Sequence, residues 1–341
     1  DKRVLAAVGK IDHMIMKAEN FMDGASYRSD VCLLWVDSDS AKGIADAFVK
    51  SHIQFDLMQD YDFRPQDLNK YGVVFVPDGY PVTDEIADEL ERYAEEGGVV
   101  IRESRDEEEL KAHSKLYGIS KETYKSEYLT ASYIRIEQEG ESLKKGMDTD
   151  KLVLRGDVCY LTPQSDTKVL ATLVPPFAPY EVVGAPPERA SMPVSHTDIP
   201  LLTWRTAGKG SVVVIPFSIG NLVTEYHLAD HYDLIRNLVK DCLGDRADME
   251  VKAPHDVQVT AYEKKDMILV HFVNETGKRP LLDNIPVTGI SFSVKVPRGK
   301  RVKNIASVIE ETEVVYERDG DCVEVTIPEL TIWDMIKIEM E

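Results

Sequence analysis

Solid apolar runs near the start of the chain constrain its fold more than any other feature of the sequence. They occupy residues 31–36, 71–77 and 99–101, and helix-forming segments separate them. Runs of this kind are typical of strands that are buried on both faces of a sheet. The helices between them begin at capping residues, Ser38 and Thr83. Strands that alternate with helices over short connections predict an α/β domain with a parallel sheet and right-handed crossovers.

The same pattern returns later in the chain. The turn Gly208-Lys209-Gly210 precedes a predicted strand over residues 211–216, and a helix over residues 231–243 follows. The intervening part, residues 106–206, is less regular and contains a proline-rich segment over residues 175–193. Because that segment is long for an ordinary connection, we interpret it as a functional loop or an interface arm.

Beyond Asp248 the pattern changes to short β-type runs. Residues 323–327, for example, alternate apolar and polar side chains, which predicts one buried and one solvent-exposed face. Several such runs, separated by regular turn signals, predict an antiparallel sandwich. We therefore expect an α/β domain over residues 25–247 and an all-β sandwich over residues 248–341.

Residues 1–24 form a predicted helix with one continuous apolar stripe. Val4, Val8, Ile11 and Ile15 recur at steps of three and four, as one face of an amphipathic helix requires. A lone helix cannot bury such a stripe. We therefore expect this linking helix to pack on the following domain or on a part of the protein that lies upstream.

The charge and the cysteines argue against several classes of function. The chain has a formal net charge of −20, which argues against nucleic-acid and anionic-membrane partners because both require clustered Lys and Arg. The four cysteines share no metal-type spacing, and their scatter is typical of a reduced, cytoplasmic protein. No apolar run in the sequence is long enough to span a bilayer.

Motifs for nucleotide chemistry are missing from the sequence. Neither Gly-x-Gly-x-x-Gly nor Gly-Lys-Ser/Thr occurs in it. Gly208-Lys209-Gly210 precedes a strand rather than a helix, so we interpret it as a hairpin-like turn. We therefore expect no nucleotide and no other cofactor.

The order of strands and helices through Glu103 resembles the class I glutamine amidotransferase-like fold, which is flavodoxin-like. That resemblance implies a nucleophilic Cys in a strained strand-to-helix turn. In this chain the third strand continues into Arg102-Glu103-Ser104-Arg105, which contains neither a cysteine nor a glycine. Ser104 lacks the strained turn, so we interpret it as a solvated polar residue at a strand end.

The resemblance also implies a His with a Glu two positions on, just after the last strand of the domain. The corresponding residues, 215–220, are Ile-Pro-Phe-Ser-Ile-Gly and contain no histidine. Because nucleophile and base are both missing, we expect the domain to be inert as an amidotransferase or a related protease. No residue of the chain is predicted to be catalytic.

A polar cluster at residues 225–231 is the remaining candidate site. His227 and His231 are four residues apart and would share a helix face beside Asp230, a pattern that resembles a metal site. However, the segment straddles a loop-to-helix junction and no third ligand stands out. We therefore predict no metal, with Asp230 as a helix cap and the histidines as surface or interface groups. Glu225, His227, Asp230 and His231 are assigned to binding or to contact with a neighbouring domain or its substrate pocket.

Carboxylates and tryptophans give no further site. With 60 Asp and Glu residues in the chain, no pair can be singled out as the acid and nucleophile of a glycosidase. Trp35 lies in a predicted buried strand and is assigned to the core. Trp204 and Trp333 stay open between a place in the core and a role in stacking on a sugar.

Over most of its length the chain resembles the C-terminal half of bacterial glycoside-hydrolase-like proteins, in which a TIM barrel is followed by a β-galactosidase-type trimerisation domain. Residues 19–25 resemble the join between the last barrel helix and that domain, and residues 271–277 (HFVNETG) resemble a strand of its terminal sandwich. The other segments that carry the resemblance are residues 30–31, 71–77, 90–101 and 208–213 and the helix at Asp230-His231.

The resemblance implies a non-catalytic region that serves oligomerisation and active-site shaping in a parent glycoside hydrolase. The catalytic carboxylates of such a parent lie on a TIM barrel, which we expect upstream of Asp1. A homo-oligomer, dimer or trimer, and a carbohydrate substrate of the parent enzyme are implied as partners. Two alternatives stay open: a carbohydrate-binding module with its site on the sandwich, and an autonomous hydrolase that uses Ser104 or the His227/His231 cluster.

Overall fold

The computed structural model describes residues 1–121, 126–175, 197–277 and 284–341 and divides into two compact units. The first unit comprises Asp1–Ser29, His52–Gln54 and Ala247–Glu341. The second comprises Asp30–Ser51 and Phe55–Arg246. Apart from Pro175, the proline-rich segment that was interpreted as a functional loop or an interface arm lies outside the described residues.

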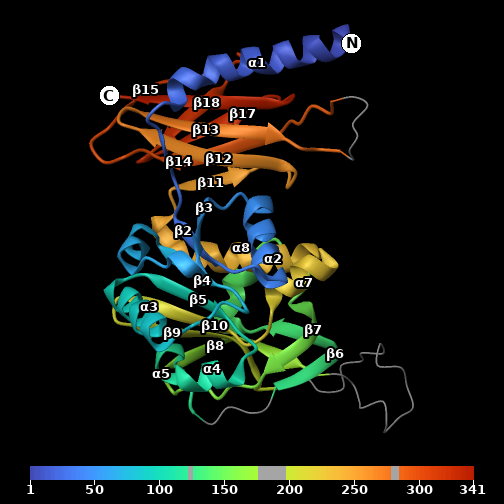
Figure 1. Ribbon diagram of the computed structural model, residues 1–341, viewed down its shortest axis with the longest axis vertical. Helices are drawn as coiled ribbons and strands as arrows, with labels where there is room; N and C mark the ends of the chain where they lie inside the picture. Colours follow the sequence, from blue (N-terminus) through green and yellow to red (C-terminus); the bar gives the residue numbers. More distant parts are fainter. Residues whose placement is uncertain (122–125, 176–196, 278–283) are drawn as a thin grey trace. The chain divides into compact units, whose positions relative to one another are not determined.

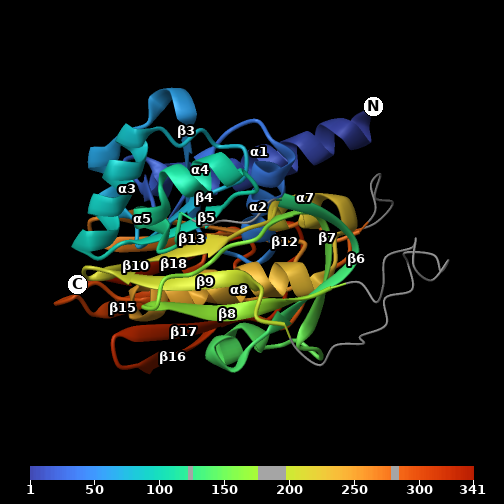
Figure 2. The same ribbon diagram turned by 90° about the horizontal axis from the view of Figure 1, so that it is seen from below.

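The second unit is built on one mixed nine-stranded sheet (Figures 1 and 2). Five neighbouring strands are parallel and lie in the order β3-β2-β4-β5-β10. Their bounds are β2 Val31–Trp35, β3 Phe55–Gln59, β4 Val73–Val76, β5 Val99–Glu103 and β10 Gly210–Ile215. All residues of β4, β5 and β10 are buried, as the solid apolar runs predict.

Four antiparallel strands extend this sheet beyond β10, in the order β9-β8-β6-β7. Their bounds are β6 Ser126–Ile136, β7 Lys151–Cys159, β8 Thr167–Val174 and β9 Pro200–Ala207. The prediction of a parallel sheet is therefore right for one half of the sheet and wrong for the other. Antiparallel neighbours need no helical crossover, and the less regular middle of the sequence supplies these strands.

Helices cover both faces of the sheet and begin where the capping residues predict. Ser38 Oγ accepts the amide of Ala41 at the start of α2, and Thr83 Oγ1 accepts that of Ile86 at the start of α3. The bounds are α2 Asp39–Lys50, α3 Asp84–Glu96, α4 Glu107–Ala112, α5 Ser114–Tyr117, α7 Ile219–Tyr226 and α8 Ala229–Leu243. Side chains from α3, α4 and α5 share a buried cluster with one face of the parallel strands.

The first unit contains two antiparallel sheets that enclose a common apolar core, consistent with the predicted sandwich. One sheet has the strand order β1-β12-β13-β18-β15 and the other has the order β11-β14-β17-β16. The bounds are β1 Ser26–Tyr27, β11 Met249–Lys252, β12 Val257–Lys264, β13 Met267–Asn274, β14 Ile290–Lys295, β15 Val302–Ser307, β16 Val315–Asp319, β17 Cys322–Ile327 and β18 Trp333–Met340.

Helix α1 (Lys2–Met22) belongs to the same unit as the sandwich, and its C-terminal half packs on it (Figure 1). Met14 and Ala18 are buried in one cluster with Leu269 and Met335. The apolar side chains at positions 4, 5, 8, 11 and 15, in contrast, are between 40% and 71% exposed. The described residues therefore leave the N-terminal half of the predicted stripe uncovered.

None of the described helices combines the length and the apolar content that crossing a bilayer requires.

Candidate functional site

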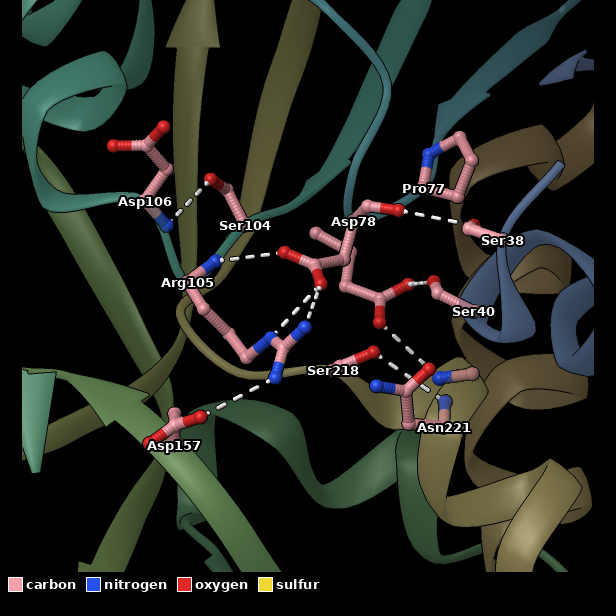
Figure 3. Close-up of polar contacts among 12 residues, drawn as sticks. Ser38, Ser40, Pro77, Asp78, Ser104, Arg105, Asp106, Asp157, Ser218 and Asn221 are labelled. Carbon is pink, nitrogen blue, oxygen red and sulfur yellow. Dashed lines mark hydrogen bonds and ion pairs between the residues drawn. The ribbon is translucent and has the colours of Figure 1, made fainter. Parts of the chain in front are cut away.

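The carboxyl edge of the parallel strands is the place where open α/β sheets bind ligands. In this chain the segments that leave β2, β4, β5 and β10 converge there, and each carries polar residues (Figure 3). Ser38 follows β2, Asp78 follows β4, Ser104 and Arg105 follow β5, and Ser218 follows β10. The edge is therefore polar, and the contacts of these residues decide what chemistry it can perform.

A buried arginine and a buried glutamate form the first group at this edge. Arg102, which is 2% exposed, donates to the carbonyl of Pro77 at 2.7 Å and to that of Tyr80 at 3.3 Å. Its guanidinium also contacts both carboxylate oxygens of Glu109, at 3.2 and 2.5 Å. Burial is the largest single influence and would lower the pKa of Arg102, but the charge and hydrogen bond of Glu109, with further contributions from Tyr117 and Asp78, together raise it. The pair is therefore a fixed and charge-balanced ion pair.

Glu109 also holds the serine at the expected position of the nucleophile. Ser104 Oγ donates to Glu109 Oε2 at 2.6 Å, and the Tyr117 hydroxyl donates to Oε1 at 2.5 Å. Ser104 is 0% exposed, so its interpretation as a solvated residue is wrong. Burial follows from the chain beyond β5, where α4 brings Glu109 back over the strand end. The serine hydroxyl therefore donates its hydrogen bond to a carboxylate. Among the described residues, no imidazole forms a hydrogen bond with this hydroxyl.

A second ion pair lies at the surface of the same edge (Figure 3). The Arg105 guanidinium donates to Asp78 Oδ2 at 2.8 Å and to Asp157 Oδ2 at 3.3 Å, and its backbone amide donates to Asp78 Oδ1 at 3.0 Å. Asp157 lies on β7, so Arg105 ties the end of β4 to the antiparallel half of the sheet. Burial is the largest single influence and would lower the pKa of Arg105, but the hydrogen bond and charge of Asp78, with the charges of Asp157 and Glu103, together raise it.

Between β2 and β4, where the strand order changes direction, side chains and turns fill the space. Ser38 Oγ donates to the carbonyl of Asp78 at 3.2 Å, and Gly79 makes the turn with a φ of +85°. Beside this closed point lies an open cleft of about 630 Å³. It is lined by residues 78–83, 102, 104–106, 109 and 157, which include both arginines and their carboxylate partners.

Glu103 is a completely buried carboxylate next to these ion pairs. Its Oε2 accepts from the Ser40 hydroxyl at 3.0 Å, and its Oε1 accepts from the amide of Gly220 at 3.2 Å. The pKa of the carboxyl is raised to about 7, chiefly by burial. Glu103 could exchange a proton near neutral pH, but no part of it faces the cleft or solvent.

The position at which the resemblance implies a catalytic base, residues 217–220, is held by contacts of the fold. Phe217 is buried, and Ser218 Oγ accepts the amide of Asn221 to cap α7. Pro216 and Phe217 also pair with the end of β7. The segment after β10 is therefore held by a helix cap and a strand contact.

The polar cluster at residues 225–231 is divided between two helices. Glu225 is exposed on α7, and His227 ends that helix in the left-handed region with a φ of 50°. His227 Nδ1 lies 3.1 Å from the Tyr232 hydroxyl, which donates to Asp46 at 2.6 Å. The expectation of one shared helix face for both histidines is wrong, because α8 begins only at Ala229.

His231 and Asp230 also differ from what the sequence suggested. His231 is 0% exposed, so it is no surface group, and its Nε2 donates to the carbonyl of Val153 at 2.8 Å. Burial lowers the pKa of His231, which keeps the ring neutral. Asp230 lies in the first turn of α8 and is not its cap. The described residues contain no group of three or more His, Cys, Asp or Glu side chains that could hold a metal ion.

The tryptophans occupy half-buried positions. Trp35 ends β2 at the rim of the buried strand, so its assignment to the core is only partly right. The Trp204 indole donates to Ser211 Oγ at 3.0 Å. Trp333 stacks on His271 and donates to its Nδ1 at 3.1 Å. Both indole N–H groups are therefore used inside the fold.

Sequence reasoning did not single out Glu103, Asp78, Glu109 and Asp157. A signal for two of them is present in the sequence, since Asp78 directly follows the apolar run 71–77 and Glu103 lies two residues beyond the run 99–101. Glu109 and Asp157 lie in segments without such a signal and reach the edge only through the fold.

Residues 37–105 match the model of the "Beta-galactosidase trimerisation domain" family. This segment runs from the end of β2 to Arg105 and so includes most of the polar edge. No curated protein matches the chain.

Several solved structures share the fold. Alpha-L-fucosidase isoenzyme 2 from Paenibacillus thiaminolyticus is 16% identical with a TM-score of 0.78, and the match covers 96% of this chain and 51% of that one. Gan42B, a GH42 beta-galactosidase from G. stearothermophilus, is 12% identical with a TM-score of 0.63, covering 99% of this chain and 44% of that one. A beta-galactosidase from Bacillus circulans sp. alkalophilus is 15% identical with a TM-score of 0.57, covering 96% and 44%.

This chain spans about half the length of these solved structures. At such identities the likeness shows the fold alone. The chain is therefore glycoside-hydrolase-like in fold, and its residues 37–105 are similar to the β-galactosidase trimerisation domain.

Proposed function

We propose that this chain is a non-catalytic region of a glycoside hydrolase that serves oligomerisation and the shaping of the active site. Its parent would carry a TIM barrel upstream, assemble as a dimer or a trimer, and act on a carbohydrate. The match of residues 37–105 to the trimerisation family supports the oligomerisation role. Fucosidase and β-galactosidase structures that share the fold support the class of the parent enzyme.

The observation that carries the non-catalytic role is the set of ion pairs and hydrogen bonds that engage the polar side chains at the carboxyl edge of the sheet. Ser104 is buried and its hydroxyl donates a hydrogen bond to Glu109, and the Arg105 guanidinium donates to Asp78 and Asp157. A nucleophile needs a base within hydrogen-bond reach. Glu109 lies within that reach of Ser104, but its carboxylate is already paired with Arg102 and accepts from Tyr117. These contacts hold the strand end as a rigid scaffold, which suits a domain that presents surfaces to other subunits.

We assign the contact surface to the turn between α7 and α8. Glu225 and His227 are exposed there, and Leu228 is 38% exposed, so all three are accessible to a neighbouring domain or a substrate pocket. Asp230 and His231 would support this surface from the first turn of α8. Helix α1 would be the linking helix to the upstream barrel, since its N-terminal half keeps an apolar stripe exposed.

The domain division proposed with this function is a linking helix over residues 1–24, an α/β domain over 25–247 and a sandwich over 248–341. We further propose that the α/β domain is flavodoxin-like and of the class I glutamine amidotransferase type. The order of its parallel strands, β3-β2-β4-β5-β10, supports this assignment because flavodoxin-like sheets have the order 2-1-3-4-5.

Neither alternative function gains an observation in its favour. A carbohydrate-binding sandwich would need a patch of exposed aromatic side chains. Trp333 is half-buried and stacked on His271, and Tyr316 on β16 is the single exposed Phe, Tyr or Trp side chain among the described residues of that unit. An autonomous hydrolase would need Ser104 or the histidines to form a reactive pair. Ser104 is bonded to Glu109, and His227 and His231 bond to separate partners, Tyr232 and Val153.

The experiment combines sedimentation velocity with assays on a panel of p-nitrophenyl glycosides. We expect the 341-residue chain to self-associate and to show no turnover above buffer. The variant Glu225→Arg with His227→Ala should weaken association at least about tenfold, as loss of central contact residues does. Glu108→Arg, an equal charge change at an exposed position of α4, is the matched control.

A chain that stays monomeric at every concentration would contradict the oligomerisation role. Turnover that disappears in Ser104→Ala would instead establish the autonomous hydrolase. Equal association of the turn variant and the control would remove the surface assignment.

A further inference from the structure

A carboxylate with no exposed surface lies where two helices meet the sheet. We propose that Glu103 is a proton-sensitive latch that holds the start of α7 against the carboxyl edge and releases it on ionisation. The latch would regulate the contact surface at residues 225–228, because α7 ends there. Only this regulatory role of the latch rests on the proposed function.

The contacts of Glu103 place it between the first turns of α2 and α7. Ser40, which donates to Oε2, lies in the first turn of α2. Gly220, whose amide donates to Oε1, lies in the first turn of α7. Glu103 itself ends β5 and pairs with Ile215 of β10. One side chain therefore connects the starts of two helices to the centre of the sheet.

The two helices approach each other closely at the same point. A Cβ on Gly43 would lie 1.9 Å from the carbonyl oxygen of Gly220, and a Cβ on Gly220 would lie 2.2 Å from that of Ser40. Thr224 Oγ1 donates to the carbonyl of Asp39 at 2.9 Å. Glu103 is completely buried while the two helices are packed in this way, so hydration of its carboxylate requires α7 to move.

The segments packed around Glu103 differ in the charged groups that they bring near its carboxyl. Asp78 after β4 raises its pKa and Arg105 after β5 offers positive charge, while Asp39 at the start of α2 points to solvent. α7 contributes no ionisable side chain before Glu225. The pKa is raised to about 7, chiefly by burial, although hydrogen bonds from Ser218, Ser40 and Gly220 lower it.

The direction of the effect follows from proton linkage. With α7 open, a hydrated glutamate returns to its ordinary pKa of about 4.3. The closed state then binds the proton more tightly than the open state, so protonation favours closure. Opening should become easier as pH rises from about 4.3 towards about 7 and should level off above that range. The full change in the opening constant is on the order of a hundredfold.

Amide hydrogen exchange in the full chain tests the latch directly. We expect the opening constants of the Gly220 and Leu222 amides, corrected for intrinsic exchange, to rise on the order of a hundredfold between about pH 5 and about pH 8. In Glu103→Gln, which keeps the shape and cannot ionise, the constants should not change with pH. Glu108→Gln removes an exposed carboxylate and should keep the wild-type profile.

A second variant keeps the test decisive if Glu103→Gln does not fold. Ser40→Ala removes one donor and should shift the transition to higher pH, which a carbon-13 titration of the Glu103 carboxyl would follow. Exchange that is independent of pH in the wild type, or equally dependent in Glu103→Gln, would overturn the latch. A monomeric chain with pH-dependent exchange would support the latch and refute the proposed contact surface, so the two failures are distinguishable.

Discussion

The carboxyl edge of the sheet and the turn between α7 and α8 are both rich in ionisable and hydroxyl side chains, but these side chains differ in their exposure to solvent. At the edge, Arg102, Glu103 and Ser104 are at most 2% exposed. At the turn, Glu225 and His227 are exposed. A buried charge must be paired and hydrogen-bonded, whereas an exposed one is stabilised by water. Arg102, Glu103 and Ser104 are thus part of the core, whereas Glu225 and His227 are accessible at the surface.

The same comparison separates two kinds of ion pair within the edge. Arg102 and Glu109 have side-chain exposures of 3% and 10%, and each meets several other partners. Arg105 and Asp157 are 36% and 46% exposed. Solvent screening makes half-exposed pairs weak, while the loss of one member of a buried pair leaves an uncompensated charge. Substitutions should therefore have effects that follow burial.

The largest effect is expected at Glu109. Glu109→Ala leaves the Arg102 guanidinium buried without its carboxylate and should lower the free energy of unfolding by about 3–5 kcal/mol. Urea denaturation monitored on the α/β unit measures this change. Replacement of both members, Arg102→Met with Glu109→Leu, should recover much of the loss, because no unpaired charge remains.

Glu108→Ala is the matched control for this experiment, since the Glu108 side chain is 89% exposed. Its effect should lie within about 0.5 kcal/mol. Similar losses in Glu108→Ala and Glu109→Ala would show that the edge is not the buried network described above.

A smaller loss is expected where α2 and α7 touch. Gly220→Ala places a Cβ 2.2 Å from the backbone oxygen of Ser40, and this overpacking should cost about 1–3 kcal/mol. Gly9→Ala on α1 meets nothing within 4 Å and should be neutral or stabilising by up to about 1 kcal/mol. Thermal unfolding of both variants measures the difference. Tolerance of Gly220→Ala would mean that the two helices are not locked together.

The smallest effect is expected at the exposed turn. His227→Gly relieves a left-handed residue but removes the contact with Tyr232, so the free energy of unfolding should change by less than about 1 kcal/mol. His231→Ala, four residues on, removes a buried donor to Val153 and should cost about 1–3 kcal/mol. Denaturant titration of the pair measures both. Equal effects would contradict the division of the two histidines between surface and interior.

The local sequence pattern predicted where several strands and helices of the fold lie along the chain. Residues 31–36 and 99–101 correspond to β2 and β5, and Ser38 and Thr83 cap the expected helices. These features could be predicted because burial on both faces and capping each leave a mark within a few residues of sequence. The antiparallel half of the sheet left a weaker mark, because buried and exposed residues alternate irregularly along strands such as β6 and β7.

The candidate site could be predicted much less well. We expected Ser104 to be solvated and His231 to lie at the surface or an interface, but both are completely buried. Burial of a residue at a strand end depends on what packs above it. For Ser104 this is Glu109 on α4, and for His231 it is the backbone of β7. The residues next to Ser104 and His231 in the sequence do not indicate which groups pack against them in the folded chain.

The sequence by itself determined that two strand-rich parts follow one another, that the early strands are buried on both faces, and that a nucleophile and base are lacking at two positions of an amidotransferase-like pattern. Only the tertiary structure decided that ion pairs and a buried carboxylate occupy the first position and that a helix cap and a strand contact hold the second. The physical reason is that hydrophobic periodicity is a local property of the chain. The pairing of buried charges, in contrast, depends on groups that folding brings together from distant segments.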